Sequence, residues 1–150
     1  MDFVCISCVA IWAIWNRTTR LAWSLGVFYI LRTLNQKYFF LGRSEGILYS
    51  YPGLPSVTIS YFDTNDFYFS GHVGSCTIYT MELIALGWSK MGNVGMTIII
   101  NQWLFLTFTR SHYVIDMVSA VIVGITAHRI GEYIVYFSDV LILRFRKARR

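Results

Sequence analysis

Long apolar runs alternate with short cationic segments along this chain, and this pattern leaves few folds open to it. A helix that crosses a membrane needs about 20 predominantly apolar residues. The first two runs fall short of that length and would reach it only by extending into their flanks. The pattern predicts an all-α, polytopic transmembrane helix bundle of about five spans, with residues 1–150 as a single domain. The five runs are Phe3–Trp15, Leu21–Leu31, Phe69–Trp88, Gly92–Phe108 and Tyr113–Phe137.

The composition agrees with a protein that dissolves in lipid. Hydrophobic residues make up 55% of the chain and charged residues 14%, whereas globular proteins carry roughly 25% charged residues. The net charge of +5 does not indicate a nucleic-acid partner, because the basic residues lie beside the apolar runs instead of covering a solvated face. A cationic rim around membrane spans accounts for them better. We therefore expect membrane lipids as partners and no nucleic acid; the oligomeric state stays open.

The largest polar interval is Asn35–Asn65, which holds both prolines and several glycines. These residues favour an irregular loop. Loops of this length in compact proteins are usually functional or disordered. The tyrosines and phenylalanines of this interval favour an aromatic cap at the level of the lipid headgroups.

The distribution of cations predicts the orientation. Arg144–Arg150 is the strongest basic cluster, so we expect a cytosolic C-terminus. Counting spans backwards makes Asn16–Arg20 a cytosolic loop, and its two arginines agree with that placement. Arg32, Lys37 and Arg43 then fall on the non-cytosolic side, against the usual bias. An anionic ligand on that side would explain them.

The same topology brings three segments to the non-cytosolic surface. These are the end of the second run, the start of the third and the start of the fifth. His112 and Asp116 are four residues apart, so on a helix they would share a face. Ionisable residues at a membrane boundary suggest a functional site. Together the segments supply Arg32, Ser70, Gly71, His72, Arg110, His112 and Asp116.

These residue types suit the chemistry of a phosphodiester. Arginine pairs with phosphate through parallel N–H donors, so Arg32 and Arg110 are candidate phosphate ligands. The Ser70 hydroxyl and the backbone at Gly71 could add hydrogen bonds, since glycine permits close approach of the chain. One histidine could attack phosphorus while Asp116 holds its other ring nitrogen. The second histidine could then protonate the departing alcohol.

Two motifs carry a family resemblance, Phe69-Ser70-Gly71-His72 and His112-Tyr113-Val114-Ile115-Asp116. The chain between Leu21 and Tyr133 resembles the lipid phosphate phosphatase superfamily. It is most similar to the lipid phosphotransferase branch, which contains sphingomyelin synthases and phosphatidylcholine:diacylglycerol cholinephosphotransferases. The resemblance implies that His112 is the nucleophile, that Asp116 orients it and that His72 serves the leaving group.

Departures from the family patterns refine this resemblance. Phe69 stands where the phosphatases have proline, and their first motif ending in Arg-Pro is absent. Arg110 lies two residues before His112, as in the cholinephosphotransferases, and Arg32 resembles an arginine that these transferases carry upstream. Family members usually have six spans, three of them before the Ser-Gly-His motif. Only two are counted here, so the chain is expected to be N-terminally incomplete or divergent.

Two acidic residues are further candidates for the headgroup site. Asp66 matches an acid that precedes the Ser-Gly-His motif in sphingomyelin synthases; the alternative is a solvated loop acid. Glu82 lies in mid-span, where it could face a quaternary ammonium headgroup or pair with Asn101 or Gln102. His128 is expected to pair with Glu132, four residues later on the same helix. The sequence predicts no metal and no cofactor.

The sequence therefore predicts an integral membrane enzyme of the endoplasmic reticulum or Golgi. Its predicted reaction moves phosphocholine, or a similar headgroup, from a phospholipid donor to diacylglycerol or ceramide through a covalent histidine intermediate. A phosphatase of the same superfamily, with water as acceptor, is one alternative. A non-catalytic membrane scaffold is the other.

Overall fold

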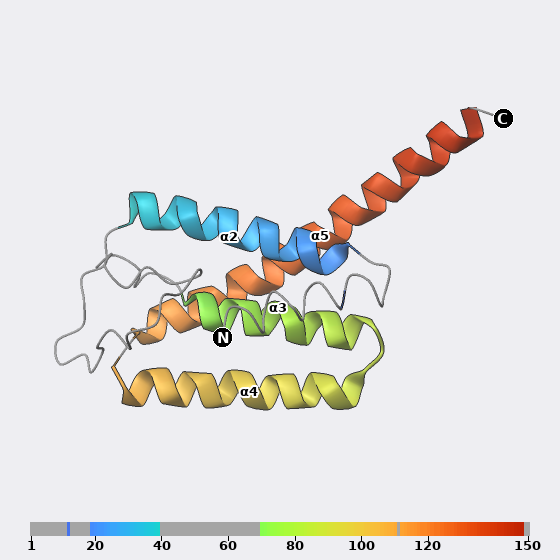
Figure 1. The fold of residues 1–150 in the computed structure, drawn as a ribbon. Helices are drawn as coiled ribbons and strands as arrows, with labels where there is room; N and C mark the ends of the chain where they lie inside the picture. Colours follow the sequence, from blue (N-terminus) through green and yellow to red (C-terminus); the bar gives the residue numbers. More distant parts are fainter. Residues whose placement is uncertain (1–11, 13–18, 40–69, 111, 149–150) are drawn as a thin grey trace.

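The computed structural model describes residues 12, 19–39, 70–110 and 112–148. The described part of the chain forms four long helices and no strand, which confirms the all-α prediction (Figure 1). Apart from Trp12, the predicted run Phe3–Trp15 lies outside the described residues, as does the predicted loop after Phe39. The helices are α2 (Arg20–Tyr38), α3 (Gly71–Ala85), α4 (Ser89–Phe108) and α5 (Val114–Ala148).

Two predicted boundaries are wrong. Asn35, the expected first residue of the loop, lies within α2, which continues to Tyr38. The Asn35 side chain donates to the Leu31 carbonyl of the same helix at 2.8 Å. The turn expected at residues 89–91 is the first turn of α4. The chain reverses just before it, where Gly87 has a φ of 80° and closes α3 with a left-handed cap.

The described part of the structure does not show the five predicted membrane spans. Among the described helices, only Val114–Ser138 within α5 is long and apolar enough to cross a membrane. Helix α3 has 15 residues, about 22 Å at the helical rise, which is shorter than a hydrocarbon core of about 30 Å. Helix α2 carries cations at both ends, and α4 carries the amides of Asn93, Asn101 and Gln102.

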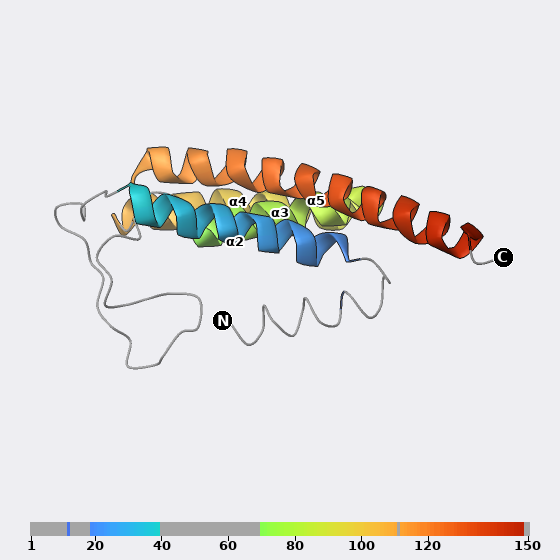
Figure 2. The same cartoon turned by 90° about the horizontal axis from the view of Figure 1, so that it is seen from above.

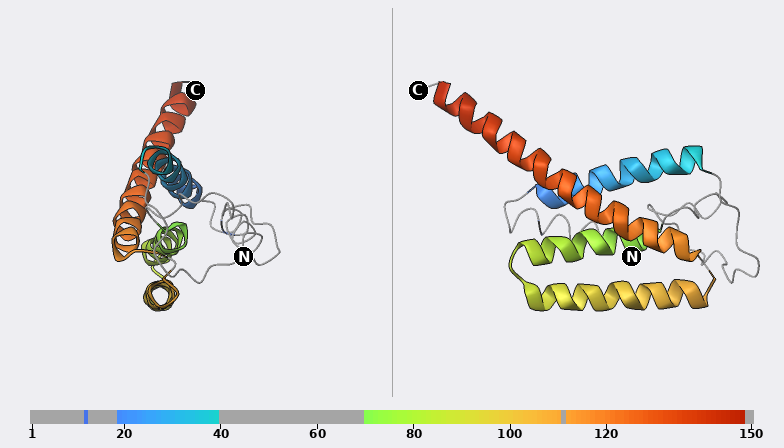
Figure 3. Two further views of the ribbon diagram at one scale, coloured as in Figure 1. Left: turned by 90° about the vertical axis from the view of Figure 1, so that its left-hand side faces the viewer. Right: turned by 180° about the vertical axis from the view of Figure 1, so that it is seen from behind.

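The helices alternate in direction, so that α3 and α5 run parallel and α2 and α4 run antiparallel to them (Figures 1 and 2). Helix α2 packs against α5 and α3, while α4 packs against the other side of α3 (Figure 3). The C-terminal ends of α2 and α4 therefore lie at the same end of the bundle as the N-terminal ends of α3 and α5.

Small residues mark the places where these helices meet. A Cβ on Gly74 would clash with the Phe28 ring, and one on Gly124 would lie 2.9 Å from the Gly74 carbonyl oxygen. A Cβ on Gly131 would meet the backbone of Ser24 at 3.0 Å. Such close backbone approach through small residues is typical of helix packing in membranes.

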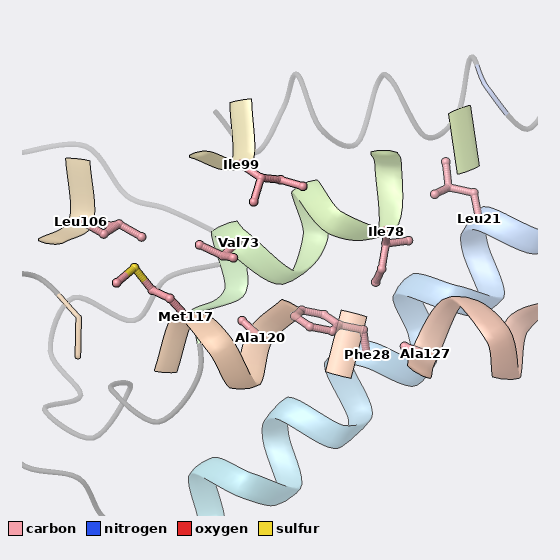
Figure 4. Packing of buried hydrophobic residues seen from close by; sticks show 9 residues of the cluster. All are labelled: Leu21, Phe28, Val73, Ile78, Ile99, Leu106, Met117, Ala120 and Ala127. Atoms are coloured by element: carbon pink, nitrogen blue, oxygen red, sulfur yellow. The ribbon is translucent and has the colours of Figure 1, made fainter. Parts of the chain in front are cut away.

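The interior mixes apolar and polar side chains, whereas the surface is largely apolar. In the described part of the chain, nine apolar residues are buried and form one cluster contributed by all four helices (Figure 4). Seven polar or charged residues of the same part are also buried, and 25 of its large hydrophobic residues are exposed. The buried polar residues are Ser24, Ser70, Thr77, Thr80, Glu82, Asp116 and His128.

Candidate active site

The predicted site residues of the described part, except Glu82, gather at one end of the bundle. The end of α2 brings Arg32, the start of α3 brings Ser70 to His72, and the start of α5 brings His112 and Asp116. Arg110 follows the end of α4. These segments lie together because the helices alternate in direction (Figure 1), as the spacing of the apolar runs predicted.

Arg32 lies directly over the first residue of α3. A Cβ built on Gly71 would be 3.2 Å from both the Cζ and the Nε of the Arg32 guanidinium. The absence of a side chain at Gly71 thus allows the guanidinium to rest against the helix start. Gly71 makes room for the arginine, in addition to the backbone exposure that the sequence suggested.

Ser70 caps the N-terminus of α3. Its Oγ accepts a hydrogen bond from the Val73 N–H at 3.4 Å, and its side chain is fully buried. This is the usual role of serine at the residue before a helix. His72 follows in the first turn of α3 and is exposed. The predicted phosphate contact of Ser70 would therefore have to share a hydroxyl already used for capping.

His112 and Asp116 approach each other, although not by the geometry that the sequence suggested. Helix α5 begins at Val114, so His112 precedes the helix and does not share one of its faces. Its Nδ1 lies 3.7 Å from the Asp116 Oδ2. This distance exceeds a hydrogen bond, but catalytic hydrogen bonds in ligand-free sites are often long.

Asp116 is fixed by the start of its own helix. Its Oδ2 accepts a hydrogen bond from the Tyr113 N–H at 2.9 Å, the contact made by the acid of a capping box. The side chain is fully buried, and among the described residues its Oδ1 accepts no hydrogen bond. One carboxylate oxygen is therefore held by the backbone beside His112.

Arg110 has a left-handed backbone with a φ of 51°, the only positive value among the described non-glycine residues. It follows Thr109, the C-cap residue of α4, and its N–H donates to the Thr107 carbonyl at 3.1 Å. This is the position after the cap where helices prefer glycine. A side chain at such a φ costs roughly 1–2 kcal/mol. Strain of this kind concentrates at functional sites.

A sequence model of the AtPDCT1/2 family matches residues 3–133. The chain belongs to this family. Its members are phosphatidylcholine:diacylglycerol cholinephosphotransferases of the lipid phosphotransferase branch of the PAP2 superfamily, which confirms the predicted resemblance. No curated protein and no solved structure matches the chain significantly.

Membership of the AtPDCT1/2 family implies a transferase that acts on phosphatidylcholine and diacylglycerol. It also implies a membrane enzyme, in agreement with the candidate span in α5. The matched range spans the positions of both histidine motifs and of Arg32 and Arg110.

Glu82 has partners that the sequence did not predict. Its carboxylate accepts hydrogen bonds from Arg20 and lies 3.1 Å from the His128 Nε2, instead of pairing with Asn101 or Gln102. The expected pair of His128 with Glu132 is therefore wrong, because the ring of His128 points to α3. Glu132 instead pairs with Arg129 at 3.0 Å.

The Glu82 contacts lie near the end of α3 opposite the candidate active site, so they do not join Glu82 to the histidine motifs. A signal for them existed in the sequence: antiparallel packing that places Arg32 beside Gly71 also places Arg20 beside residue 82. Asp66, the other candidate for the headgroup, lies outside the described residues.

Proposed function

We propose that this AtPDCT1/2 family member transfers phosphocholine from phosphatidylcholine to diacylglycerol through a covalent intermediate on His112. The observation that carries the proposal is the buried Asp116 carboxylate, held by the Tyr113 N–H with its Oδ2 facing the Nδ1 of His112. A carboxylate on Nδ1 leaves the Nε2 of the ring as the nucleophile.

The first half of the reaction breaks the bond between phosphorus and the glycerol oxygen. The Nε2 of His112 attacks phosphorus, and His72 donates a proton to the departing diacylglycerol oxygen. Phosphocholine is then bound to His112, whose positive ring Asp116 stabilises. In the second half, His72 accepts the hydroxyl proton of an incoming diacylglycerol, and that oxygen displaces His112.

Arg32 and Arg110 neutralise the phosphoryl oxygens in this proposal. Arg32 lies against Gly71 at the N-terminus of α3, and the N-terminus of a helix favours an anion. Positive groups fixed before the reaction stabilise charge that develops in the transition state. Ser70 and Gly71 border this position. Asp66 is the acid proposed for the choline, whereas Glu82 lies near the opposite end of α3.

The membrane arrangement is part of the same proposal. A single polytopic bundle is supported by the contrast between a polar interior and an apolar surface, since lipid-facing helices need no polar exterior. Buried hydroxyls are satisfied within their helices, as when Thr77 donates to the Val73 carbonyl at 2.8 Å. The cationic tail favours a cytosolic C-terminus, and the proposal then puts the active site on the far side of the membrane, in the endoplasmic reticulum or Golgi.

The test uses the full chain purified into phosphatidylcholine vesicles whose choline is labelled. A new labelled lipid, made from the acceptor, should form only when diacylglycerol or ceramide is supplied with acyl chains that distinguish it from the donor. Diacylglycerol should be the preferred acceptor. His112→Ala and His72→Ala should abolish transfer, while Tyr133→Phe, an exposed aromatic change on α5, should keep it. Release of free phosphocholine or phosphate without an acceptor would favour a hydrolase. Transfer that survives His112→Ala would refute the mechanism.

A further inference from the structure

A second buried polar cluster, made of Arg20, Glu82 and His128, joins α2, α3 and α5. The Nε and Nη2 of Arg20 donate to the Oε2 and Oε1 of Glu82 at 2.7 and 3.0 Å. The same Oε2 lies 3.1 Å from the His128 Nε2. Glu82 is fully buried and His128 is 1% exposed. Because a buried charge is tolerated only when it is paired, these contacts make the three helices depend on one another.

At the other end of the bundle, the same three helices carry Arg32, His72 and Asp116, and His112 lies just before α5. Arg20 precedes Arg32 by about 18 Å of helix, and His72 precedes Glu82 by about 15 Å, at 1.5 Å per residue. The cluster and the candidate active site are thus two separate connections among the same helices. Between them, the contacts of these helices are chiefly apolar or between small residues.

The point where α2 crosses α5 lies next to this cluster. Ser24, one turn after Arg20, touches Gly131 so closely that a Cβ on the glycine would lie 3.0 Å from the Ser24 nitrogen. A contact between small residues sets the distance between two helices but leaves their crossing angle variable, and crossing angles scatter by about 15–20°. Glu82 contacts both Arg20 of α2 and His128 of α5, and these two directed contacts together restrict that angle.

A change in the crossing angle of α2 and α5 at Ser24 would displace Arg32, which lies on the same helix as Ser24. The two residues are separated by about 12 Å of helix. A rotation of about 10°, smaller than the usual scatter of crossing angles, would displace Arg32 by about 2 Å. Misplacement of a catalytic group by about 1 Å can reduce a rate by about 100-fold.

We infer that Glu82 is a positioning residue for headgroup transfer, which fixes α2 and α5 relative to α3 so that Arg32 and the His112–Asp116 pair meet the same phosphate. This inference rests on the proposed function. It gives Glu82 a role in the reaction without contact with the headgroup.

The first test is Glu82→Asp in the full chain in phosphatidylcholine vesicles. Aspartate keeps the charge and both partners but shortens the side chain by one methylene, so the helices must shift to restore the contacts. We expect kcat to fall about tenfold, while KM for diacylglycerol and the melting temperature change little. Lys90→Gln, a change of an exposed charged residue at the start of α4, away from the cluster, serves as control and should change kcat less than twofold.

The second test replaces the whole cluster by apolar residues, as Arg20→Met, Glu82→Met and His128→Leu together. Apolar replacement of a buried ion cluster often preserves or raises stability, but it removes the directed bonds. We expect a folded protein with low kcat. A kcat at the wild-type level in either variant would overturn the inference, and so would variants that fail to fold, since the cluster would then serve folding alone. An active wild type with an inactive His112→Ala variant would show that the proposed function itself still holds.

Discussion

Arg110→Gly tests two effects of Arg110 independently: the strain of its backbone, which affects stability, and the charge of its guanidinium, which affects activity. The φ of 51° at Arg110 costs an ordinary residue roughly 1–2 kcal/mol, and glycine would remove that strain. The greater freedom of glycine in the unfolded chain offsets about 0.4–1 kcal/mol of the gain. The variant should therefore be as stable as the wild type or more stable by up to about 1.6 kcal/mol.

Activity should change in the opposite direction. If Arg110 stabilises the phosphoryl oxygens, its removal should lower kcat by about 100- to 1,000-fold, as for other donors that stabilise a transition state. The kcat of Arg110→Lys should lie between those of the wild type and Arg110→Gly, because lysine keeps the charge but not the paired donors of the guanidinium. Melting temperature and transfer of labelled phosphocholine, measured on the same vesicle preparation, give both quantities.

Lys90→Gln is the matched control, since it removes an exposed cation at the opposite end of α4. It should leave transfer unchanged. Full activity of Arg110→Gly would refute the role of Arg110 as a phosphate ligand. A large loss of stability in that variant would refute the argument from backbone strain.

Two further predictions concern the core of the site. Asp116→Asn keeps a side-chain oxygen for capping α5 but loses the negative charge that faces His112. We therefore expect kcat to fall at least 100-fold, while the melting temperature drops by a few degrees at most. Equal losses of activity and folding would show that the carboxylate is purely structural. Gly74→Val places methyl groups where the Phe28 ring lies, so overpacking should cost about 1–3 kcal/mol; the companion change Phe28→Ala in the same chain should recover part of that loss in thermal unfolding.

The order of the apolar runs was sufficient to predict which segments meet at one end of the bundle. Alternating helices must return every second terminus to the same end, so Arg32, the Ser-Gly-His motif and His112 could be brought together from spacing alone. The number of spans could not be obtained in this way. Length and hydropathy do not tell how far a helix such as α2 extends through polar flanks, and it continues to Tyr38, beyond the expected loop start.

Local geometry at the site depended on interactions that a motif does not encode. The four-residue spacing of His112 and Asp116 suggested a shared helix face, yet the helix begins between them because Asp116 accepts the Tyr113 N–H. The predicted partners of Glu82, Asn101 and Gln102, lie on the next helix in sequence, whereas its observed partners are Arg20 and His128. They lie on helices far along the chain, where only the packing of α2 and α5 on α3 brings them within reach.

The direction of the helices also determines which end of the bundle suits an anion. Helices α3 and α5 both begin at the site, and the start of a helix carries about half a positive charge. Arg32 adds a full charge over the first residue of α3, and Arg110 follows the C-cap residue of α4. Asp116 neutralises part of this field at α5, but its hydrogen bond to the backbone directs the carboxylate toward His112. A phosphodiester at this end would meet positive groups from all four described helices, whereas Glu82 places the buried negative charge of α3 near its other end.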